Sequence, residues 1–538
     1  MAESIKNKKI LIRGVNWIGD AVLTTPTIQA LRKAFPQAHI SLLVRPWVAP
    51  IFESNPHINE IILYEDSFKR ISGKFKLAKI LREKNFDTAI LLQNAFDAAL
   101  IAWLSRIPER IGYERDRRGL LLTKAIPVTK EILKKHQVYY YLNLIETMGI
   151  RTEKAQLSYP EVSGQRPYIY LRDEEIQQAR TLLTPSPTTY HQSPIIGINP
   201  GATYGSAKRW MSERFAWLAQ RIINELNGKV VIFGSQSEVK IAEEIVKTVK
   251  NISHFSFPIS HLLVMAGKTD LRELITLINE CDAFITNDSG PMHIASALGV
   301  PTVAIFGSTD PCIAGPFGNG HMVIKKNMQC SPCLKRECPE GSLKCMDAIT
   351  VEDVFDALQE ILPKNKAVLL DRDGTLIEDA HYLNDFSKLK IFHDAKQALA
   401  RLKTAGFKLI GITNQSGIAR GIVTEEFVKE SNSYIQKELG IDAFYYCPHH
   451  PDDSCMCRKP EQGLLQKARL EHGINLKNSY IIGDKLSDML VAKRAGAKGI
   501  LVMTGDGVEV IQEKVAGTSY VADNLDDAVN LILRQDKQ

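Results

Sequence analysis

Short apolar runs rich in β-branched residues recur along the chain and alternate with amphipathic stretches of helical length. Continuous apolar strands of this kind are typical of parallel sheets that are covered by helices on both faces. The alternation therefore predicts doubly wound α/β units. In the first two thirds of the chain, the predicted strands are Lys9–Arg13, Ile40–Val44, Thr88–Leu92, Ile195–Ile198, Lys229–Phe233, Ala283–Thr286 and Thr302–Phe306. The predicted helices between them include Ala21–Phe35, Ser212–Leu226 and Leu271–Cys281.

The length of the chain and two irregular stretches predict how it divides into domains. With about 150 residues per domain, the 538 residues predict three or four domains. A less regular stretch from about Ser163 to Pro194 contains the helix-like Asp173–Leu183 and the turn-rich PSPTTYHQSP, which is a candidate connection. A short polar linker follows at Leu362-Pro363-Lys364-Asn365. The predicted domains are residues 1–165, 166–362 and 366–538.

The composition narrows the class of protein. Hydrophobic residues make up 44% and charged residues 24%, as in an ordinary globular protein with large cores. No apolar run reaches the roughly 18 residues that a membrane span requires, and the start MAESIKNKKILIRG lacks the features of a signal peptide. We therefore expect a cytoplasmic protein. Its net charge of +6 permits attraction to anionic lipid or phosphorylated substrates and does not indicate nucleic acid.

The sequence DRDGT, residues 371–375, directly follows the apolar run Ala367–Leu370. Asp371 and Asp373 stand one residue apart where a buried strand gives way to a turn, so both can serve one site. Gly374 permits a tight turn there. One carboxylate can act as a nucleophile while the other donates and accepts protons. Alone, the pattern also suits a polar strand end or a cation site.

Three later segments support chemistry at this site. TNQSGIARG, residues 413–421, offers a hydroxyl and glycines that allow close approach to an anion. Arg458-Lys459-Pro460 supplies two cations, and GDKLSD, residues 483–488, adds Asp484 and Asp488 after a third apolar run. Open α/β sheets bind ligands at the carboxyl ends of their strands. A hydroxyl, a lysine and clustered acids in such positions are what phosphoryl transfer assisted by a cation requires.

A cysteine–histidine loop lies between the second and third of these segments. Cys447, His449, Cys455 and Cys457 give the pattern C-x-H-x5-C-x-C. Three thiols and an imidazole within eleven residues form a ligand set of the structural zinc type. Free thiols in a reducing cytosol are the alternative, and disulfides are disfavoured because nothing marks the chain as secreted.

These segments are, in order, the four motifs of the haloacid dehalogenase phosphatases, which this part of the chain resembles. With the cysteine–histidine loop and SGIARG, residues 366–538 resemble the D-glycero-D-manno-heptose 1,7-bisphosphate phosphatases. The resemblance implies Asp371 as nucleophile, Asp373 as general acid and base, and Mg²⁺ on Asp371, Asp484 and the Asp373 carbonyl. Hard oxygen ligands suit Mg²⁺. The residues implied to bind phosphate or substrate are Thr413, Asn414, Ser416, Arg458 and Lys459.

Three loops in the first 360 residues follow predicted strands and carry charged residues. RGVNWIGDAVLTTP, residues 13–26, places Asp20 where a helix begins, a position that also suits a simple helix cap. NPGATYGSAKRW, residues 199–210, is rich in glycine and carries Lys208. In residues 286–307, TNDSGPMHIASALGVPTVAIFG, we expect a helix to begin near Pro291. A helix N-terminus after Ser-Gly is a ready diphosphate site.

Residues from about 8 to 358 resemble the lipopolysaccharide heptosyltransferases, chiefly the heptosyltransferase II type, which have the two-domain GT-B architecture. The resemblance implies Asp20 as the base that takes the acceptor hydroxyl proton while ADP leaves the inverted anomeric carbon. Lysine and helix amides would stabilise the diphosphate without a metal. The residues implied to bind the donor are Lys208, Glu238, Asp288, Ser289, Gly290 and His293. From its position alone, His293 also suits a packed helix face.

A second cysteine cluster stays undecided at this level. Cys330, Cys333, Cys338 and Cys345 have the spacing C-x2-C-x4-C-x6-C, which suits a metal. The transferase family that the chain resembles has no established metal there, so we make no assignment.

The sequence as a whole predicts a bifunctional enzyme of lipopolysaccharide core biosynthesis. Its expected fold is α/β: a GT-B glycosyltransferase with two Rossmann-like domains, then a Rossmann-like phosphatase domain with a zinc loop. The implied partners are ADP-L-glycero-D-manno-heptose, the lipopolysaccharide inner core, heptose bisphosphate and the inner membrane surface; the implied cofactors are Mg²⁺ and Zn²⁺. Alternatives are histidinol phosphate as substrate, a phosphatase half that is only a zinc-stapled scaffold, a different transferase acceptor, and a sugar-binding module in the first half.

Overall fold

The computed structural model describes residues 8–150, 166–183, 193–252, 261–512 and 517–536. The chain forms two compact units, Met1–Ile361 and Leu362–Gln538, each of which is described by itself. Residues 151–165 and 184–192, which hold the first predicted domain boundary and most of the predicted connection PSPTTYHQSP, lie outside the described residues. No helix in the described ranges combines the length and the apolar character that crossing a bilayer requires.

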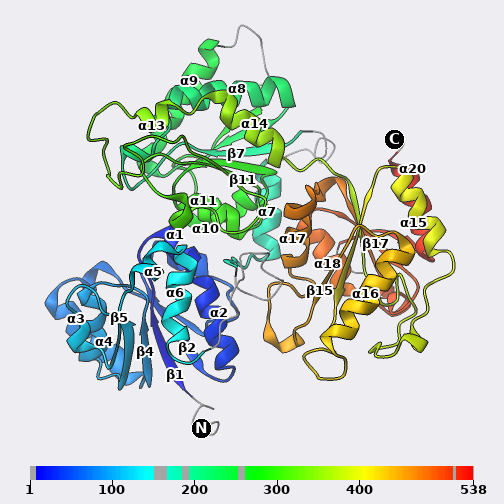
Figure 1. The fold of residues 1–538 in the computed structure, drawn as a ribbon, viewed down its shortest axis with the longest axis horizontal. Helices are drawn as coiled ribbons and strands as arrows, with labels where there is room; N and C mark the ends of the chain where they lie inside the picture. Colours follow the sequence, from blue (N-terminus) through cyan, green and yellow to red (C-terminus); the bar gives the residue numbers. More distant parts are fainter. Residues whose placement is uncertain (1–7, 151–165, 184–192, 253–260, 513–516, 537–538) are drawn as a thin grey trace. The chain divides into compact units, whose positions relative to one another are not determined.

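The first unit begins with a six-stranded parallel sheet in the order β3-β2-β1-β4-β5-β6 (Figure 1). Its strands are β1 (Lys9–Arg13), β2 (His39–Val44), β3 (Glu60–Leu63), β4 (Thr88–Leu91), β5 (Glu109–Tyr113) and β6 (Lys124–Ile126). The helices are α1 (Ile18–Leu23), α2 (Thr25–Ala34), α3 (Ile71–Glu83), α4 (Phe96–Leu104), α5 (Lys130–Lys134), α6 (Gln137–Glu146) and the connecting α7 (Asp173–Leu183). Side chains alternate between the two faces of the sheet: Leu11 and Leu91 pack with α3 and α4, whereas Ile10 and Ile12 pack with α2 and α6.

A second parallel sheet completes this unit, in the order β12-β11-β10-β7-β8-β9. Its strands are β7 (Ile195–Asn199), β8 (Lys229–Ile232), β9 (Leu262–Val264), β10 (Ala283–Asn287), β11 (Thr302–Ile305) and β12 (Met322–Ile324). The helices are α8 (Ser212–Leu226), α9 (Val239–Ile252), α10 (Leu271–Asn279), α11 (Gly290–Ala297), α12 (Pro311–Ala314), α13 (Lys344–Asp347) and α14 (Val351–Ile361).

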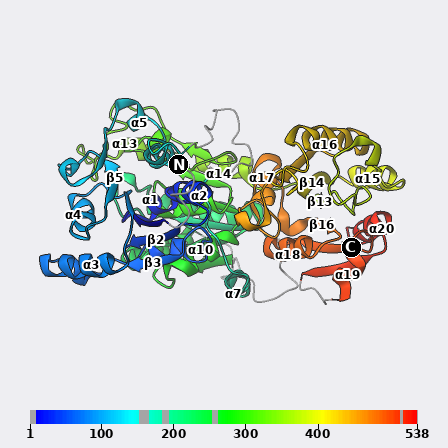
Figure 2. The same cartoon turned by 90° about the horizontal axis from the view of Figure 1, so that it is seen from below.

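The second unit is built on a third parallel sheet, in the order β15-β14-β13-β16-β17-β18. Its strands are β13 (Ala367–Leu370), β14 (Lys408–Asn414), β15 (Ala443–Cys447), β16 (Tyr480–Gly483), β17 (Lys498–Val502) and β18 (Thr518–Ala522). The helices are α15 (Ala395–Thr404), α16 (Glu425–Leu439), α17 (Gly463–His472), α18 (Leu486–Ala495), α19 (Gly507–Gln512) and α20 (Leu525–Gln535). In Figures 1 and 2, α17 and α18 lie on one side of this sheet and α15 and α20 on the other, where α15 packs against both α16 and α20.

The strands predicted from the sequence in the first unit are all present, with ends that differ by one residue at most. The single helix predicted over Ala21–Phe35 is wrong: Thr24 ends α1 and precedes α2. Pro26 lies in the first turn of α2, where its missing N–H is tolerated; inside one long helix it would remove a hydrogen bond. The helix expected near Pro291 begins at Gly290.

Candidate active sites

The carboxyl ends of three adjacent strands of the third sheet meet at one point. Asp371 follows β13, Thr413 is the second-last residue of β14, and Asp484 follows β16. All three side chains are buried. Carboxylate oxygens of Asp371, Asp484 and Asp488 lie within 4.8 Å of one another. The motifs that the sequence analysis took from distant segments are therefore brought together because parallel strands end at a common edge.

Lys459 joins these carboxylates. Its Nζ donates to Asp371 Oδ1 at 2.7 Å, to Asp488 Oδ1 at 2.5 Å and to the carbonyl of Ile412 at 2.9 Å. Burial alone would lower the pKa of Lys459, but the carboxylates of Asp371 and Asp488 outweigh burial and raise it. The lysine is therefore a fixed cation that faces the predicted nucleophile. Asp488, which the sequence placed among the clustered acids without a role of its own, holds the lysine from the other side.

Asp484 accepts no hydrogen bond from a lysine among the described residues, so its surroundings indicate whether the site fits a metal cation. Its Oδ2 accepts from the N–H of Asp506 at 3.0 Å, but its buried Oδ1 has no hydrogen-bond partner among the described residues. Burial and the nearby Asp371 carboxylate raise the pKa of Asp484 to about 8. Gly374 and Gly505 leave room for this carboxylate, because a Cβ on either would fall 2.2 Å from Asp484 Oδ2. Three clustered acids, one of them with a buried oxygen that has no hydrogen-bond partner among the described residues, fit a hard divalent cation.

The carboxylate of Asp373 is held by side chains that the sequence analysis missed. Arg372 donates to both of its oxygens, from Nε and Nη2 at 3.0 Å each. Gln415 donates from Nε2 to Asp373 Oδ2 at 2.9 Å and to Thr413 Oγ1 at 2.8 Å. Arg372 is itself buried and anchored on Asn432 at 3.1 Å. Neighbouring residues on a strand point to opposite faces, so the sequence provided no reason to expect the Arg372 side chain to contact the Asp373 carboxylate.

Of the remaining predicted phosphate ligands, Asn414 is already bound to the backbone, whereas Arg458 keeps a donor without a partner among the described residues. Both polar atoms of Asn414 are bound to the backbone of Lys459: Oδ1 accepts from its N–H at 3.0 Å and Nδ2 donates to its carbonyl at 3.1 Å. Asn414 thus positions the lysine. Ser416 is half-buried in the turn after β14. Arg458 is half-buried, and its buried Nη1 has no hydrogen-bond partner in the described part of the chain, which leaves a donor for an anion.

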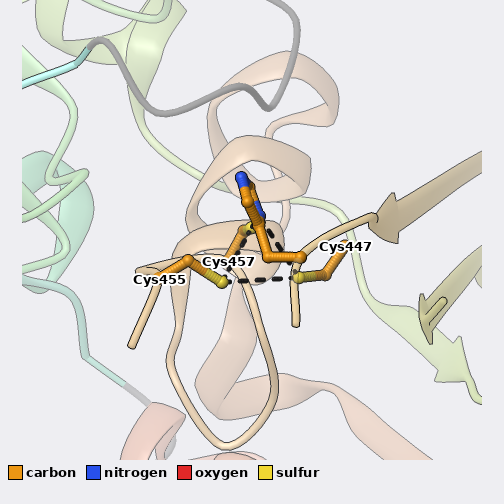
Figure 3. A group of neighbouring side chains, drawn as sticks. Cys447, Cys455 and Cys457 are labelled. Atoms are coloured by element: carbon orange, nitrogen blue, oxygen red, sulfur yellow. Dashed lines mark hydrogen bonds between the residues drawn. The ribbon is translucent and has the colours of Figure 1, made fainter. Parts of the chain in front are cut away.

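The predicted cysteine–histidine loop forms one cluster (Figure 3). Cys447 Sγ lies 3.4 Å from Cys455 Sγ and 3.6 Å from His449 Nδ1. Cys457 Sγ lies 3.5 Å from Cys455 Sγ and 3.2 Å from His449 Nδ1. A tetrahedral zinc with Zn–S bonds of about 2.3 Å separates its ligands by about 3.7 Å, so the donor set fits that ion. Arg458 and Lys459 directly follow the last cysteine of the cluster.

The first unit brings α1 of its first sheet against α11 of its second sheet. A Cβ on Gly290 would fall 2.9 Å from Ile18 Cγ2, and one on Gly19 would fall 2.6 Å from His293 Cδ2. The close approach of the two helices therefore depends on glycine at both positions. It brings Asp20 from the first sheet close to Lys208, Asp288 and His293 from the second sheet.

Asp20 does not cap its helix. The N-cap of α1 is Trp17, no side chain caps it, and Asp20 is in the first turn. The half-buried Asp20 carboxylate instead accepts a hydrogen bond from Tyr141 of α6. Burial raises the pKa of Asp20, the hydrogen bond from Tyr141 and the charge of Lys208 oppose that change, and Asp288 adds to it. The helix-cap interpretation of Asp20 is therefore wrong.

The predicted donor-binding residues line the second sheet's side of this region. Lys208 pairs with Asp288 at 2.5 Å, and Thr309 donates to the same Asp288 oxygen at 2.6 Å. Ser289, directly before Gly290 and the start of α11, is hydrogen-bonded to Asn199 at 3.2 Å. His293 is buried; burial lowers its pKa to about 4, so it is neutral at pH 7.

Glu238 lies in the loop after β8 and caps its own 3-10 turn through Ser235. Its carboxylate also lies against the glycine-rich loop, since a Cβ on Gly201 would fall 1.9 Å from Glu238 Oε1.

The four cysteines of the undecided cluster are not gathered in the same way as the zinc-type set. Cys330 is exposed and Cys345 is buried, and no three of Cys330, Cys333, Cys338 and Cys345 place their sulfurs within 4.8 Å of one another.

These two sites define an α/β enzyme chain with one glycosyl-transfer type of site and one phosphoryl-transfer type. The family model of glycosyltransferase family 9 (heptosyltransferase) matches residues 74–344, and a HAD-hydrolase-like model matches residues 456–528. Lipopolysaccharide heptosyltransferase 2 of Escherichia coli K12 is 31% identical over 361 residues, which are 67% of this chain and 100% of that protein. The solved E. coli ADP-heptose LPS heptosyltransferase II has a TM-score of 0.54 and 29% identity, covering 66% of this chain and 98% of its own.

The second unit has relatives of its own. D-glycero-beta-D-manno-heptose-1,7-bisphosphate 7-phosphatase of Photorhabdus laumondii is 41% identical over 164 residues, 28% of this chain and 87% of that protein. The chain therefore belongs to the heptosyltransferases of glycosyltransferase family 9 in its first unit and to the HAD-like heptose bisphosphate phosphatases in its second. It is a fusion of two enzymes, which confirms the resemblance found in the sequence.

Proposed function

We propose that the first unit transfers heptose from ADP-L-glycero-D-manno-heptose to the lipopolysaccharide inner core. We propose further that the second unit removes the C7 phosphate of D-glycero-D-manno-heptose 1,7-bisphosphate. The relatives support both substrates, since they are named for these activities. The observation that carries the proposal is the pair of catalytic carboxylates, Asp371 and Asp20, each beside a lysine suited to a phosphate group.

In the phosphatase unit, an oxygen of Asp371 attacks the C7 phosphorus and forms an aspartyl phosphate, while the bond to the sugar oxygen breaks. Asp373 donates a proton to that leaving oxygen and then takes one from the water that hydrolyses the aspartyl phosphate. Arg372 and Gln415 keep the Asp373 carboxylate aimed at the site. Lys459 and Thr413 hold the phosphoryl oxygens, and Arg458 holds the remaining phosphate of the sugar.

Mg²⁺ suits this unit, with Asp371, Asp484 and the Asp373 carbonyl as its ligands. When bound, it would supply positive charge for the oxygens of the phosphoryl group. The support on the protein side is the buried Oδ1 of Asp484, which has no hydrogen-bond partner among the described residues, within the cluster that Asp484 forms with Asp371 and Asp488.

In the transferase unit, Asp20 takes the proton of the acceptor hydroxyl as that oxygen attacks the anomeric carbon. ADP leaves from the opposite face, so the configuration inverts. Its diphosphate would bind at the N-terminus of α11, near Ser289 and Gly290, with Lys208 released from Asp288 to meet the charge. Tyr141 holds Asp20 in place, and neutral His293 packs beside Gly19.

We also propose a structural zinc on Cys447, His449, Cys455 and Cys457. The ion would fix the loop whose next two residues are Arg458 and Lys459, so its loss should affect both stability and phosphate release. Metal analysis of the full chain should find about one tightly held zinc, lost in Cys455→Ser. Cys312→Ser, at an exposed free cysteine, is the control. A zinc-free chain with normal phosphate release would contradict the assignment.

The decisive experiment supplies the purified chain with the substrates of both reactions and measures each product separately. Release of phosphate from the two anomers of heptose 1,7-bisphosphate tests the second unit, and histidinol phosphate is the competing substrate. Release of ADP from ADP-heptose in the presence of a heptose-bearing inner-core acceptor tests the first unit. We expect heptose bisphosphate to be hydrolysed much faster than histidinol phosphate. Equal or reversed preference would assign the phosphatase to the alternative substrate.

A further inference from the structure

The outer face of α4 is unusually apolar for a helix at the surface. Its sequence, FDAALIAWL, contains a single charged residue, Asp97. Asp97 is already engaged, because it forms an ion pair with Lys74 and accepts from Tyr64. Phe96 is 45% exposed and Trp103 is 50% exposed, and their i, i+7 spacing places them on one side of the helix. A helix that is apolar all round is normally buried, so the exposed apolar face of α4 is expected to bind a partner.

Helix α3 continues this surface and adds positive charge. It packs against α4, and the two helices cover the same face of the first sheet (Figures 1 and 2). Leu77 and Leu81 point into the core, whereas Ile71 and Phe75 remain 75% and 58% exposed. Residues 65–84 contain seven lysines and arginines against three acidic residues.

The cations beside the apolar side chains are available for a partner. Arg70, Lys76, Lys79 and Arg106 are exposed and form no ion pair with any described residue. Leu120, in the 3-10 turn Gly119–Leu121 that contacts α4, is 97% exposed and extends the apolar surface. The surface thus consists of large apolar side chains surrounded by unpaired positive charge.

We propose that this α3–α4 surface, formed by Ile71, Phe75, Phe96, Trp103 and Leu120 with Arg70, Lys76, Lys79 and Arg106, docks on an anionic lipid bilayer. The apolar side chains would enter the boundary between headgroups and acyl chains, where tryptophan is favoured. The cations would meet the negative headgroups, each contributing about a fivefold gain in binding. Charge complementarity favours a bilayer over an uncharged apolar partner, since the patch carries cations that such a partner would leave unpaired.

Flotation of the full chain with vesicles tests the proposal without any substrate, so its outcome is independent of the proposed transferase activity. The vesicles contain phosphatidylethanolamine and phosphatidylglycerol, or phosphatidylcholine alone. We expect binding to the anionic vesicles, weakened by salt, and little binding to the neutral ones. Lys76→Glu/Lys79→Glu should weaken binding by about 30-fold or more. Phe75→Ser/Trp103→Ser should reduce it to background while the chain melts as before, because both side chains are already exposed.

Matched controls lie on other helices of the same unit. Trp217→Ser on α8 removes another exposed tryptophan, and Lys240→Glu/Lys247→Glu reverses two exposed lysines on α9. We expect both controls to bind vesicles as the unaltered chain does. Transfer to a deacylated, water-soluble acceptor should stay unchanged in the α3–α4 variants, whereas transfer to an acceptor embedded in anionic vesicles should fall.

Several results would overturn the proposal. Equal binding to anionic and neutral vesicles would remove the role of the cations. Full binding by the α3–α4 variants, or equal losses in the α8 and α9 controls, would place membrane contact elsewhere. A dimer that forms without vesicles and is abolished by Phe75→Ser/Trp103→Ser would assign the surface to a second copy of the chain.

Discussion

The phosphatase site and the transferase site differ in how they are assembled. The phosphatase residues all come from one sheet, and Lys459, Asp371 and Asp488 are joined by short hydrogen bonds within one buried cluster. The transferase residues come from two sheets, and Asp20 meets Lys208, Asp288 and His293 only because α1 packs against α11. The first site is therefore fixed by one fold, and the second depends on the packing of two.

This difference has consequences for charge. In the phosphatase site, three buried acids cluster around Lys459 and one Asp484 oxygen has no hydrogen-bond partner among the described residues, so the site suits a divalent cation. In the transferase site, Lys208 and Asp288 already neutralise one another. Burial raises the pKa of Asp20, and the hydrogen bond from Tyr141 and the charge of Lys208 oppose that change. We therefore expect substitutions in the phosphatase site to affect stability as well as rate, and those in the transferase site to affect chiefly rate.

The largest effect is expected for Asp371→Asn. No neighbouring group can replace a covalent nucleophile, so phosphate release should fall on the order of 10⁴-fold or more. The measurement is single-turnover phosphate release from heptose bisphosphate. Asp452→Asn, at an exposed position in the cysteine–histidine loop, is the control and should release phosphate normally. Comparable rates in both variants would remove Asp371 from the mechanism.

Lys459→Met should reduce phosphate release by roughly 10³-fold, because it removes a fixed donor to the phosphoryl oxygens. It also leaves two buried carboxylates without their cation, which should cost about 3–5 kcal/mol of unfolding free energy. Urea unfolding of the second unit, together with kinetics, measures both. A variant that loses activity but keeps its stability would mean that the Asp371–Lys459–Asp488 cluster is not paired as described.

Asp20→Ala should lower the maximal transfer rate by roughly 10²-fold or more, with donor affinity nearly unchanged. Because Asp20 is not the N-cap of α1, the melting temperature should change little. Glu131→Ala, another acid in the first turn of a helix, is the matched control and should transfer normally. If the variant transferred at a normal maximal rate yet bound the donor poorly, Asp20 would belong to donor recognition.

Tyr141→Phe should have the smallest effect, and one that depends on pH. The hydrogen bond from Tyr141 lowers the pKa of Asp20, so its loss should raise that pKa further. A base must be deprotonated to act, so transfer falls as the pH drops through the pKa of Asp20. The acid limb of the profile should therefore move to higher pH in Tyr141→Phe, with a nearly normal rate at high pH. An unmoved limb would mean that Asp20 is not the titrating base.

The two sites also differ in how far the sequence predicted them. The strand-end motifs at Asp371, Thr413 and Asp484 could be placed together because parallel strands share one carboxyl edge. The roles of Asp488 and Arg372 were not predicted, because they depend on contacts with Lys459 and Asp373 that no spacing reveals.

In the first unit, strands were predictable from apolar runs, but the break of α1 and α2 at Thr24 was not. Sequence position suggested that Asp20 caps a helix, and only packing against α6 and α11 gives its carboxylate a different partner. Contacts between sheets are long-range in sequence, so motif spacing alone does not determine them.

The central claim is that one chain carries two chemically independent active sites. The most direct test measures each activity in the variant that disables the other site. Heptosyl transfer is measured in Asp371→Asn, and phosphate release in Asp20→Ala, from the same preparations. The account predicts that both rates stay within about twofold of the unaltered chain, because the two carboxylates belong to separate compact units and share no partner residue. A large loss of transfer in Asp371→Asn, or of phosphate release in Asp20→Ala, in variants that melt normally would contradict it.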